Sequence, residues 1–240
     1  MKNKFLIAVL FMSLSTLVLA QRPTSFLELG GYGMSQNYLG DVNSNSLSAF
    51  TQEARFGAGV QIKYNFSSLW SVGADVNFGD LYSHDNLHGN ESRDYKVDTE
   101  ILQMGVFTNL HFIPFGKYNL RHKHTPFLHL GMNALTYQPN LNTNAQYPDE
   151  IELYPGTGRA LGYSIGFGWR IRRSLKSFYN VGVFYNGFGV SNIEGFNYND
   201  EFTAANPGIR NSLDGCMTLK FGMSLGFLSS KFSAQPLNHI

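Results

Sequence analysis

Strict alternation of residue types is the feature of this sequence that most restricts its fold. In residues 160–172 one set of alternate positions holds large apolar side chains, and the other holds mainly glycine and small residues. Successive side chains of a β-strand point to opposite faces, so a period of two predicts a strand with one apolar face. The pattern recurs in residues 54–66, 70–80 and 217–227, and less strictly in residues 26–34, 98–112, 126–137 and 178–188. Helical spacing fits none of these segments, and we predict eight strands.

The second face of these strands indicates where the apolar face points. A soluble β-sandwich turns a face rich in charged and hydroxyl residues toward water. Here that face carries glycine, small residues and a few charges of both signs, among them Glu28, Arg55, Lys63, Asp75 and Arg170. Such a set suits the narrow lumen of a closed barrel. We therefore predict an all-β fold, an eight-stranded antiparallel up-and-down transmembrane β-barrel of the OmpA/OmpX type with a filled lumen. A soluble sandwich and a lipocalin-like barrel are the alternatives.

Connection lengths distinguish the two ends of the predicted barrel. Short connections alternate with long ones, as in outer-membrane barrels with short periplasmic turns and long outer loops. The short ones are residues 67–68 and 173–176, together with a medium turn at 113–125, and the long ones are residues 35–53, 81–96, 139–159 and 190–213. An even number of strands then places both termini in the periplasm.

Charge separates along the same axis. The four long connections contain eleven acidic and four basic residues. The predicted periplasmic segments contain eight basic and no acidic residues, and six of the basic residues lie in or directly beside two turns: Lys117, Arg121, Lys123, Arg172, Arg173 and Lys176. Two interpretations are open, since this end can rest on lipid phosphates or dock an acidic periplasmic partner.

The first twenty residues predict a secretory signal peptide. Basic residues precede a mostly apolar run over residues 5–19, and Ala20 fits the last position before a cleavage site. No second long apolar run follows, so we expect no transmembrane helix in the mature chain. The predicted organisation is a cleaved signal peptide at 1–20, an outer-membrane barrel at 21–227 and a periplasmic tail at 228–240.

The sequence offers little for catalysis or cofactor binding. His84 and His88 fall in a polar loop without the spacing of a metal site. His111 and His129 fall on the predicted lumenal face, where we expect them in a polar network. The net charge of +1 gives no reason to expect nucleic acid as a partner. We predict a protein that is not an enzyme and has no cofactor, metal or small-molecule substrate; a lipid-modifying barrel enzyme is the less favoured alternative.

Cys216 is the single cysteine of a chain predicted to be exported. By parity it faces the lumen at the outer end of the last strand. An intermolecular disulfide and a small buried residue are both open interpretations.

The last predicted strand matches a known pattern. Lys220, Gly222, Leu225 and Phe227 resemble the C-terminal assembly signal of outer-membrane barrels, in which a polar residue and a glycine precede two hydrophobic residues. Most such barrels end at that aromatic residue, whereas this chain continues for thirteen residues. That the assembly machinery reads this strand is therefore a hypothesis.

The chain resembles a family of small barrels that includes PorG, the outer-membrane barrel of the type IX (Por) secretion system. The residues that carry the resemblance are Phe26–Gly31, Asn37–Asp41, the aromatic–proline turn Phe112–Phe115, Thr125–Phe127 and the aromatic-rich strand Gly162–Trp169. The resemblance implies a non-enzymatic outer-membrane component that anchors a periplasmic ring of PorK and PorN type, and the basic turns are then the expected contact surface. A general OmpA-like structural or adhesive barrel, acting through its acidic outer loops, is the main alternative.

Overall fold

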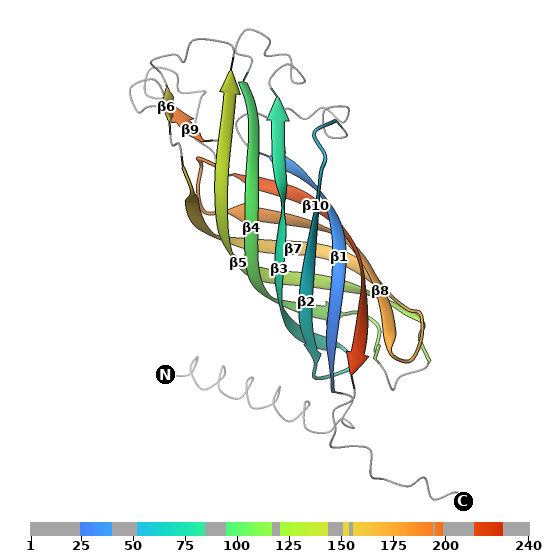
Figure 1. The fold of residues 1–240 in the computed structure, drawn as a ribbon. Helices are drawn as coiled ribbons and strands as arrows, with labels where there is room; N and C mark the ends of the chain where they lie inside the picture. Colours follow the sequence, from blue (N-terminus) through green and yellow to red (C-terminus); the bar gives the residue numbers. More distant parts are fainter. Residues whose placement is uncertain are drawn as a thin grey trace, which may run out of the picture.

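The computed structural model describes residues 25–39, 52–84, 95–116, 121–143, 151–153, 156–193, 195–198 and 214–227. Within them eight strands form a closed barrel (Figure 1), which confirms the predicted fold class. The strands are β1 (Phe26–Leu39), β2 (Arg55–Asn65), β3 (Trp70–His84), β4 (Tyr95–His111), β5 (His124–Thr143), β7 (Gly158–Arg172), β8 (Ser177–Phe188) and β10 (Gly215–Phe227). The predicted signal peptide, the predicted tail and Lys117 lie outside the described residues. No helix in the described ranges is long and apolar enough to cross a membrane.

Each barrel strand pairs with its neighbours in chain order, and the first strand pairs with the last. The order around the barrel is β1-β2-β3-β4-β5-β7-β8-β10, and β10 returns to β1. Leu29 of β1, for example, lies opposite Ile62 of β2 on one side and opposite Leu225 of β10 on the other. Closure gives each strand two hydrogen-bonded neighbours, which is what a backbone inside hydrocarbon requires.

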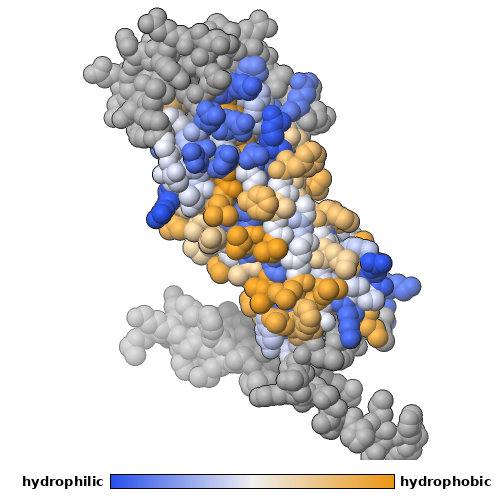
Figure 2. All heavy atoms as spheres, in the orientation of Figure 1, coloured by the Kyte–Doolittle hydropathy of each residue, from blue (hydrophilic) through white to orange (hydrophobic). Residues whose placement is uncertain are grey.

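The outward side chains form an apolar belt around the barrel. Phe56 is 82% exposed, and the exposed side chains of Val60, Ile62 and Tyr64 follow it along the outer face of β2. The intervening Lys63 is only 3% exposed, because it points into the lumen. Figure 2 shows apolar surface between more hydrophilic zones toward the two ends. The predicted orientation of the alternating faces is therefore confirmed, and the belt has the character of a surface that contacts lipid.

Three strands project beyond the belt at the end with long connections. β3, β4 and β5 reach His84, Tyr95 and Thr143, several residues further than the alternation predicted. The outer face of this extension is polar and the inner face is apolar: Asp80, Asp98 and Glu100 point outward, and Leu81, Ile101 and Leu135 are buried. The alternation thus continues beyond the belt, but with the polar residues outside and the apolar residues inside. The sequence prediction relied on outward apolar residues, so it ended these three strands at the edge of the belt.

A small second sheet lies at the same end. β6 (Ile151–Leu153) pairs with β9 (Phe196–Tyr198), so two of the long connections meet there (Figure 1). The sequence did not predict these strands, because three residues are too few to reveal a period of two.

The lumen is closed at both ends. At the long-connection end Ile193 joins a buried cluster with Tyr38, Leu81 and other apolar residues. Its backbone is fixed from two sides, because its N–H donates to Asp214 Oδ2 (2.8 Å) and its carbonyl accepts from Thr99 Oγ1 (2.8 Å). At the short-turn end a second cluster comprises Phe26, Phe115 and Phe178.

A cation placed in the apolar belt should destabilise the barrel. Val106 of β4 is 61% exposed within the belt, so Val106→Arg puts a guanidinium into hydrocarbon and should cost about 2–4 kcal/mol of unfolding free energy. Urea unfolding in lipid vesicles measures this cost. Glu100→Arg is the matched control, because it lies on the same strand and face but beyond the belt, and it should cost about 0–1 kcal/mol. Equal costs at the two positions would contradict the membrane position of the belt.

Candidate functional site

Exposed basic side chains gather on one arc of the short-turn end. Arg121, Lys123, Arg173 and Lys176 are exposed there, and we call these four residues the basic rim. The backbone brings their segments together, because Arg172 N–H donates to the Lys123 carbonyl (2.7 Å) and Gly226 N–H donates to the Lys176 carbonyl (2.7 Å). Among the described residues this end exposes no carboxylate.

The β7–β8 turn is a rigid part of this arc. Ser177 N–H and Lys176 N–H donate to Ser174 Oγ at 3.1 and 3.2 Å, and Arg173 N–H donates to the Ser177 carbonyl at 3.0 Å. At its tip Leu175 is 56% exposed between two basic residues. The turn therefore presents one apolar and two cationic side chains in a fixed backbone conformation.

Arg172 differs from the rim, although the sequence grouped it with the same basic turns. Its guanidinium donates to the Gly116 carbonyl and lies 4.9 Å from the centre of the Phe115 ring. Phe115 N–H donates to the Ser68 carbonyl (2.8 Å), which ties the β4–β5 turn to the β2–β3 turn. Arg172 and Phe115 thus hold the turn across the barrel mouth. Phe115 carries no periodic signal in the sequence, because it lies in a turn.

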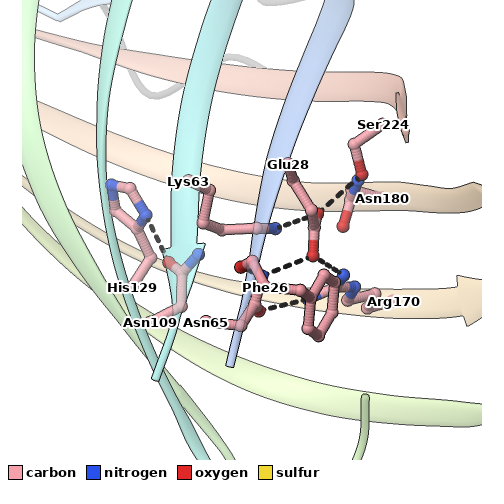
Figure 3. A network of polar contacts seen from close by, with 9 residues as sticks. All are labelled: Phe26, Glu28, Lys63, Asn65, Asn109, His129, Arg170, Asn180 and Ser224. Carbon is pink, nitrogen blue, oxygen red and sulfur yellow. Dashed lines mark hydrogen bonds and ion pairs between the residues drawn. The ribbon is translucent and has the colours of Figure 1, made fainter. Parts of the chain in front are cut away.

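A buried polar network lies directly behind this closure (Figure 3). Glu28 is 1% exposed, and both of its oxygens are used. Oε1 accepts from the Arg170 guanidinium and from Asn65 Nδ2 (2.6 Å), and Oε2 accepts from Ser224 Oγ (2.9 Å) and pairs with Lys63 Nζ (3.2 Å). One carboxylate therefore links β1, β2, β7 and β10 across the lumen, as expected for paired charges inside a small barrel.

A second charge pair lies further along the lumen. Lys220 Nζ is 3.2 Å from Asp75 Oδ2, and Tyr32 Oη donates to the same oxygen at 2.9 Å. Glycine at position 222 leaves room for the Tyr32 side chain, because a Cβ on residue 222 would lie 2.5 Å from Tyr32 Cβ. Leu225 and Phe227 are exposed on the outer face. The four residues of the predicted assembly signal thus divide between lumen and belt, and their recognition by the assembly machinery stays a prediction.

The two histidines predicted to face the lumen are buried there. His129 Nδ1 lies 2.8 Å from Asn109 Oδ1, and its Nε2 lies 3.2 Å from Ser164 Oγ. His111 packs edge-on against the Phe127 ring. The polar network is confirmed for His129. It is wrong for His111, since neither of its buried ring nitrogens has a hydrogen-bond partner among the described residues. Within the described ranges no three His, Cys, Asp or Glu side chains are arranged to hold a metal ion, and His88 lies outside them.

Cys216 is fully buried at the long-connection end, on the lumenal side that parity predicts. Asn186 Nδ2 donates to its sulfur at 3.6 Å, and Thr218 Oγ1 lies at the same distance. Another chain reaches this thiol only if the barrel opens locally. The intermolecular disulfide stays an untested interpretation, and the burial favours the alternative, a small buried residue.

Several residues of these networks were not singled out from the sequence. Asn65 and Ser224 fall on the lumenal parity of their strands, so the alternation could have found them. Asp214 precedes β10 and holds the long-connection closure through Ile193 and through the Tyr38 hydroxyl. Its position outside a strand leaves no periodic signal.

The belt, the lumen and the unequal ends define the class of the molecule: it is an integral membrane β-barrel of the eight-stranded outer-membrane type. The chain belongs to the DUF6089 family, a domain of unknown function, whose profile matches residues 3–228. No curated protein sequence is significantly similar to this chain.

Several solved outer-membrane barrels are similar to this chain at low sequence identity. Neisserial surface protein A is 12% identical over 85% of this chain and 97% of its own, with a TM-score of 0.45. OprG from Pseudomonas aeruginosa is 14% identical over 87% and 98%, with a TM-score of 0.43. The outer membrane enzyme PagL is 11% identical over 81% and 97%, with a TM-score of 0.45. At these identities the likeness concerns the fold alone.

Removing the central carboxylate should destabilise the barrel. Glu28→Gln leaves Lys63 and Arg170 buried without their counter-charge, and we expect a loss of about 3–5 kcal/mol in unfolding free energy. Urea unfolding in vesicles measures it. Asp98→Asn removes an exposed carboxylate from the same protein and should change the value by less than about 0.5 kcal/mol. A loss no larger for Glu28→Gln than for this control would mean that the network contributes nothing.

Native membranes should show no disulfide-linked dimer through Cys216, because the thiol is buried. Non-reducing gels of the wild type and of Cys216→Ser, with and without reductant, make the comparison. A thiol-sensitive band above the monomer that is missing from Cys216→Ser would establish the intermolecular bridge instead.

Proposed function

We propose that this protein is a non-enzymatic outer-membrane anchor of the type IX secretion system, which holds periplasmic ring subunits of PorK and PorN type through its short-turn end. The observation that supports the proposal is the basic rim. Its four exposed cations share one arc, and among the described residues this end exposes no carboxylate. A one-sign patch of this kind attracts and orients an acidic partner surface.

The orientation follows from the connections. The chain enters β1 and leaves β10 at the short-turn end (Figure 1), and outer-membrane barrels keep their termini and short turns in the periplasm. The rim then faces the periplasm just outside the belt. Leu175 adds an exposed apolar side chain between Arg173 and Lys176 in the same turn.

The closed lumen supports a function in which partners bind at the ends of the barrel. Both mouths are filled by apolar clusters, and charged side chains cross the lumen between them. A barrel of eight strands leaves no aqueous channel. We therefore assign the protein a tethering role, in which cargo does not pass through its lumen.

A second candidate is a structural or adhesive barrel that acts through its outer end. The outer face of the projecting strands favours it, because Asp80 lies opposite Glu100 in the register and Asp98 is on the same face of β4. Trimming the long connections should abolish adhesion under this candidate, whereas it should leave secretion intact under the anchor proposal. A lipid-modifying enzyme is the third candidate, and an unchanged lipid A in a deletion strain would dismiss it.

Charge reversal of the rim should break partner binding. Arg173→Glu with Lys176→Glu changes the net charge by four units in the β7–β8 turn, and we expect recovery of the crosslinked periplasmic ring proteins to fall about tenfold. Lys96→Glu with Arg159→Glu is the matched control, because it makes the same substitutions at exposed positions of the opposite end. Mass spectrometry of the crosslinked complexes measures the recovery.

Secretion completes the test. Cargo should accumulate in the periplasm of a deletion strain and of the rim variant, and the control variant should export normally. Normal export from the deletion strain would refute the secretion role. Unchanged ring recovery from the rim variant would mean that the rim contacts only lipid phosphates.

A further inference from the structure

A hollow lies in the apolar belt, on the outer face of the neighbouring strands β2, β3, β4 and β5 (Figure 1). Its volume is about 730 Å³, within the range of roughly 300–1,000 Å³ in which proteins hold small ligands. One row of its lining consists of residues that lie opposite one another on five successive strands: Leu27, Tyr64, Val72, Thr108 and Leu130. Neighbouring strands are about 4.8 Å apart, so this row is about 19 Å long.

The row runs obliquely into the belt. Leu27 is one residue from the short-turn end of β1, whereas Leu130 is six residues from the short-turn end of β5. The hollow therefore begins at the edge of the belt beside the short turns and leads toward the middle of the belt. Tyr64 is exposed near this edge, and such aromatic side chains with a polar tip are typical of the boundary between lipid and water. A lipid of that leaflet has its headgroup at the same edge and its acyl chains inside the belt.

Small side chains make the hollow. Ala74 and Thr108 point outward within it, on the neighbouring strands β3 and β4. The larger, exposed side chains of Tyr64 and Leu130 stand on either side of Thr108 in its row. The outer face is therefore low over β3 and β4 and higher over β2 and β5.

The lining of the hollow is apolar at its centre. The hydroxyl of Thr108 is already used, because it donates to the Ser71 carbonyl (3.1 Å) and accepts from the Trp70 indole N–H. The wall behind is closed, since the Phe107 ring fills the lumenal side of Gly73, where a Cβ would lie 2.5 Å from Phe107 Cζ. The site therefore suits an apolar ligand that comes from the membrane.

The hollow is continuous with the belt, so hydrocarbon is what meets it. In hydrocarbon, packing drives association, and an unfilled space forfeits dispersion contacts. A flexible chain fills a long, shallow hollow, whereas the convex wall of a second barrel would bridge it. We propose that the hollow binds one acyl chain of a phospholipid from the leaflet at the short-turn end, with the headgroup beside Leu27 and Tyr64. The basic rim contributes no residue to this site, which is therefore independent of the proposed anchoring role.

Native mass spectrometry tests the proposal on the wild-type barrel. The protein would be reconstituted in vesicles of phosphatidylethanolamine, phosphatidylglycerol and lipid A, and then transferred to a mild detergent. We expect one retained phospholipid per barrel. A barrel that retains no lipid, or that retains lipid A in place of the phospholipid, would overturn the proposal. A dimer without lipid would also overturn it, and would assign the hollow to a second copy of the chain.

Matched variants locate the bound lipid. Ala74→Phe places a ring where the acyl chain lies, so we expect the retained phospholipid to fall about tenfold. Ala58→Phe is the control, because it makes the same substitution on the outer face of β2, two residues from the exposed Phe56 and Val60, at a position that does not line the hollow. It should retain the phospholipid. Equal retention by the two variants would mean that the lipid binds elsewhere.

Fluorescence quenching gives a second measure in vesicles, without detergent. Trp169→Phe leaves Trp70 as the single tryptophan, and Trp70 contacts Thr108 in the lining of the hollow. A phospholipid with brominated acyl chains quenches tryptophan on contact. Adding Ala74→Phe should lower the quenching of Trp70, whereas adding Ala58→Phe should leave it unchanged. The same quenching in all three proteins would contradict an acyl chain bound in the hollow.

Discussion

Hydrogen bonding of the backbone in hydrocarbon is the constraint on which the rest of this structure depends. A strand that crosses a bilayer must satisfy its N–H and C=O groups from neighbouring strands, so the sheet has to close. The pairing of β1 with β10 meets this requirement over thirteen residue pairs from Leu27 to Leu39. Closure then fixes which way every side chain points. It sends Ile62 to the lipid and Lys63 to the lumen, although the two are adjacent in the chain.

Closure with eight strands also explains why charged side chains pair with one another in the interior. The lumen is narrow, so its charged side chains meet across it, and Glu28 of β1 contacts Arg170 of β7 on a distant part of the wall. The apolar clusters around Phe115 and Ile193 keep this network away from both openings. The surfaces left for soluble partners are then the two ends of the barrel. Their exposed charges have opposite signs, since the rim is basic and the outer face of β3 and β4 is acidic.

The alternation predicted the barrel, the belt and the lumenal position of Lys63, His129 and Cys216, because a period of two determines the face of each residue. It did not predict which lumenal residues touch. Glu28 and Arg170 are 142 positions apart, and their contact depends on the tilt and register of the whole barrel. Phe115, Asp214 and the short strands β6 and β9 lie outside any long alternating segment. Arg172 shows a further limit, since basic character alone did not separate a residue that closes the mouth from exposed neighbours such as Arg173.

Oxygen accessibility along β4 tests the orientation of the wall most directly. Single cysteines at residues 102–110, introduced into Cys216→Ser and carrying spin labels, would be measured in lipid vesicles. Leu102, Met104, Val106 and Leu110 point outward, whereas Gln103, Phe107 and Asn109 are buried. The even positions should therefore show high accessibility to oxygen dissolved in the bilayer, and the odd positions should show low accessibility. Accessibility without a period of two, or with the period inverted, would contradict the membrane barrel.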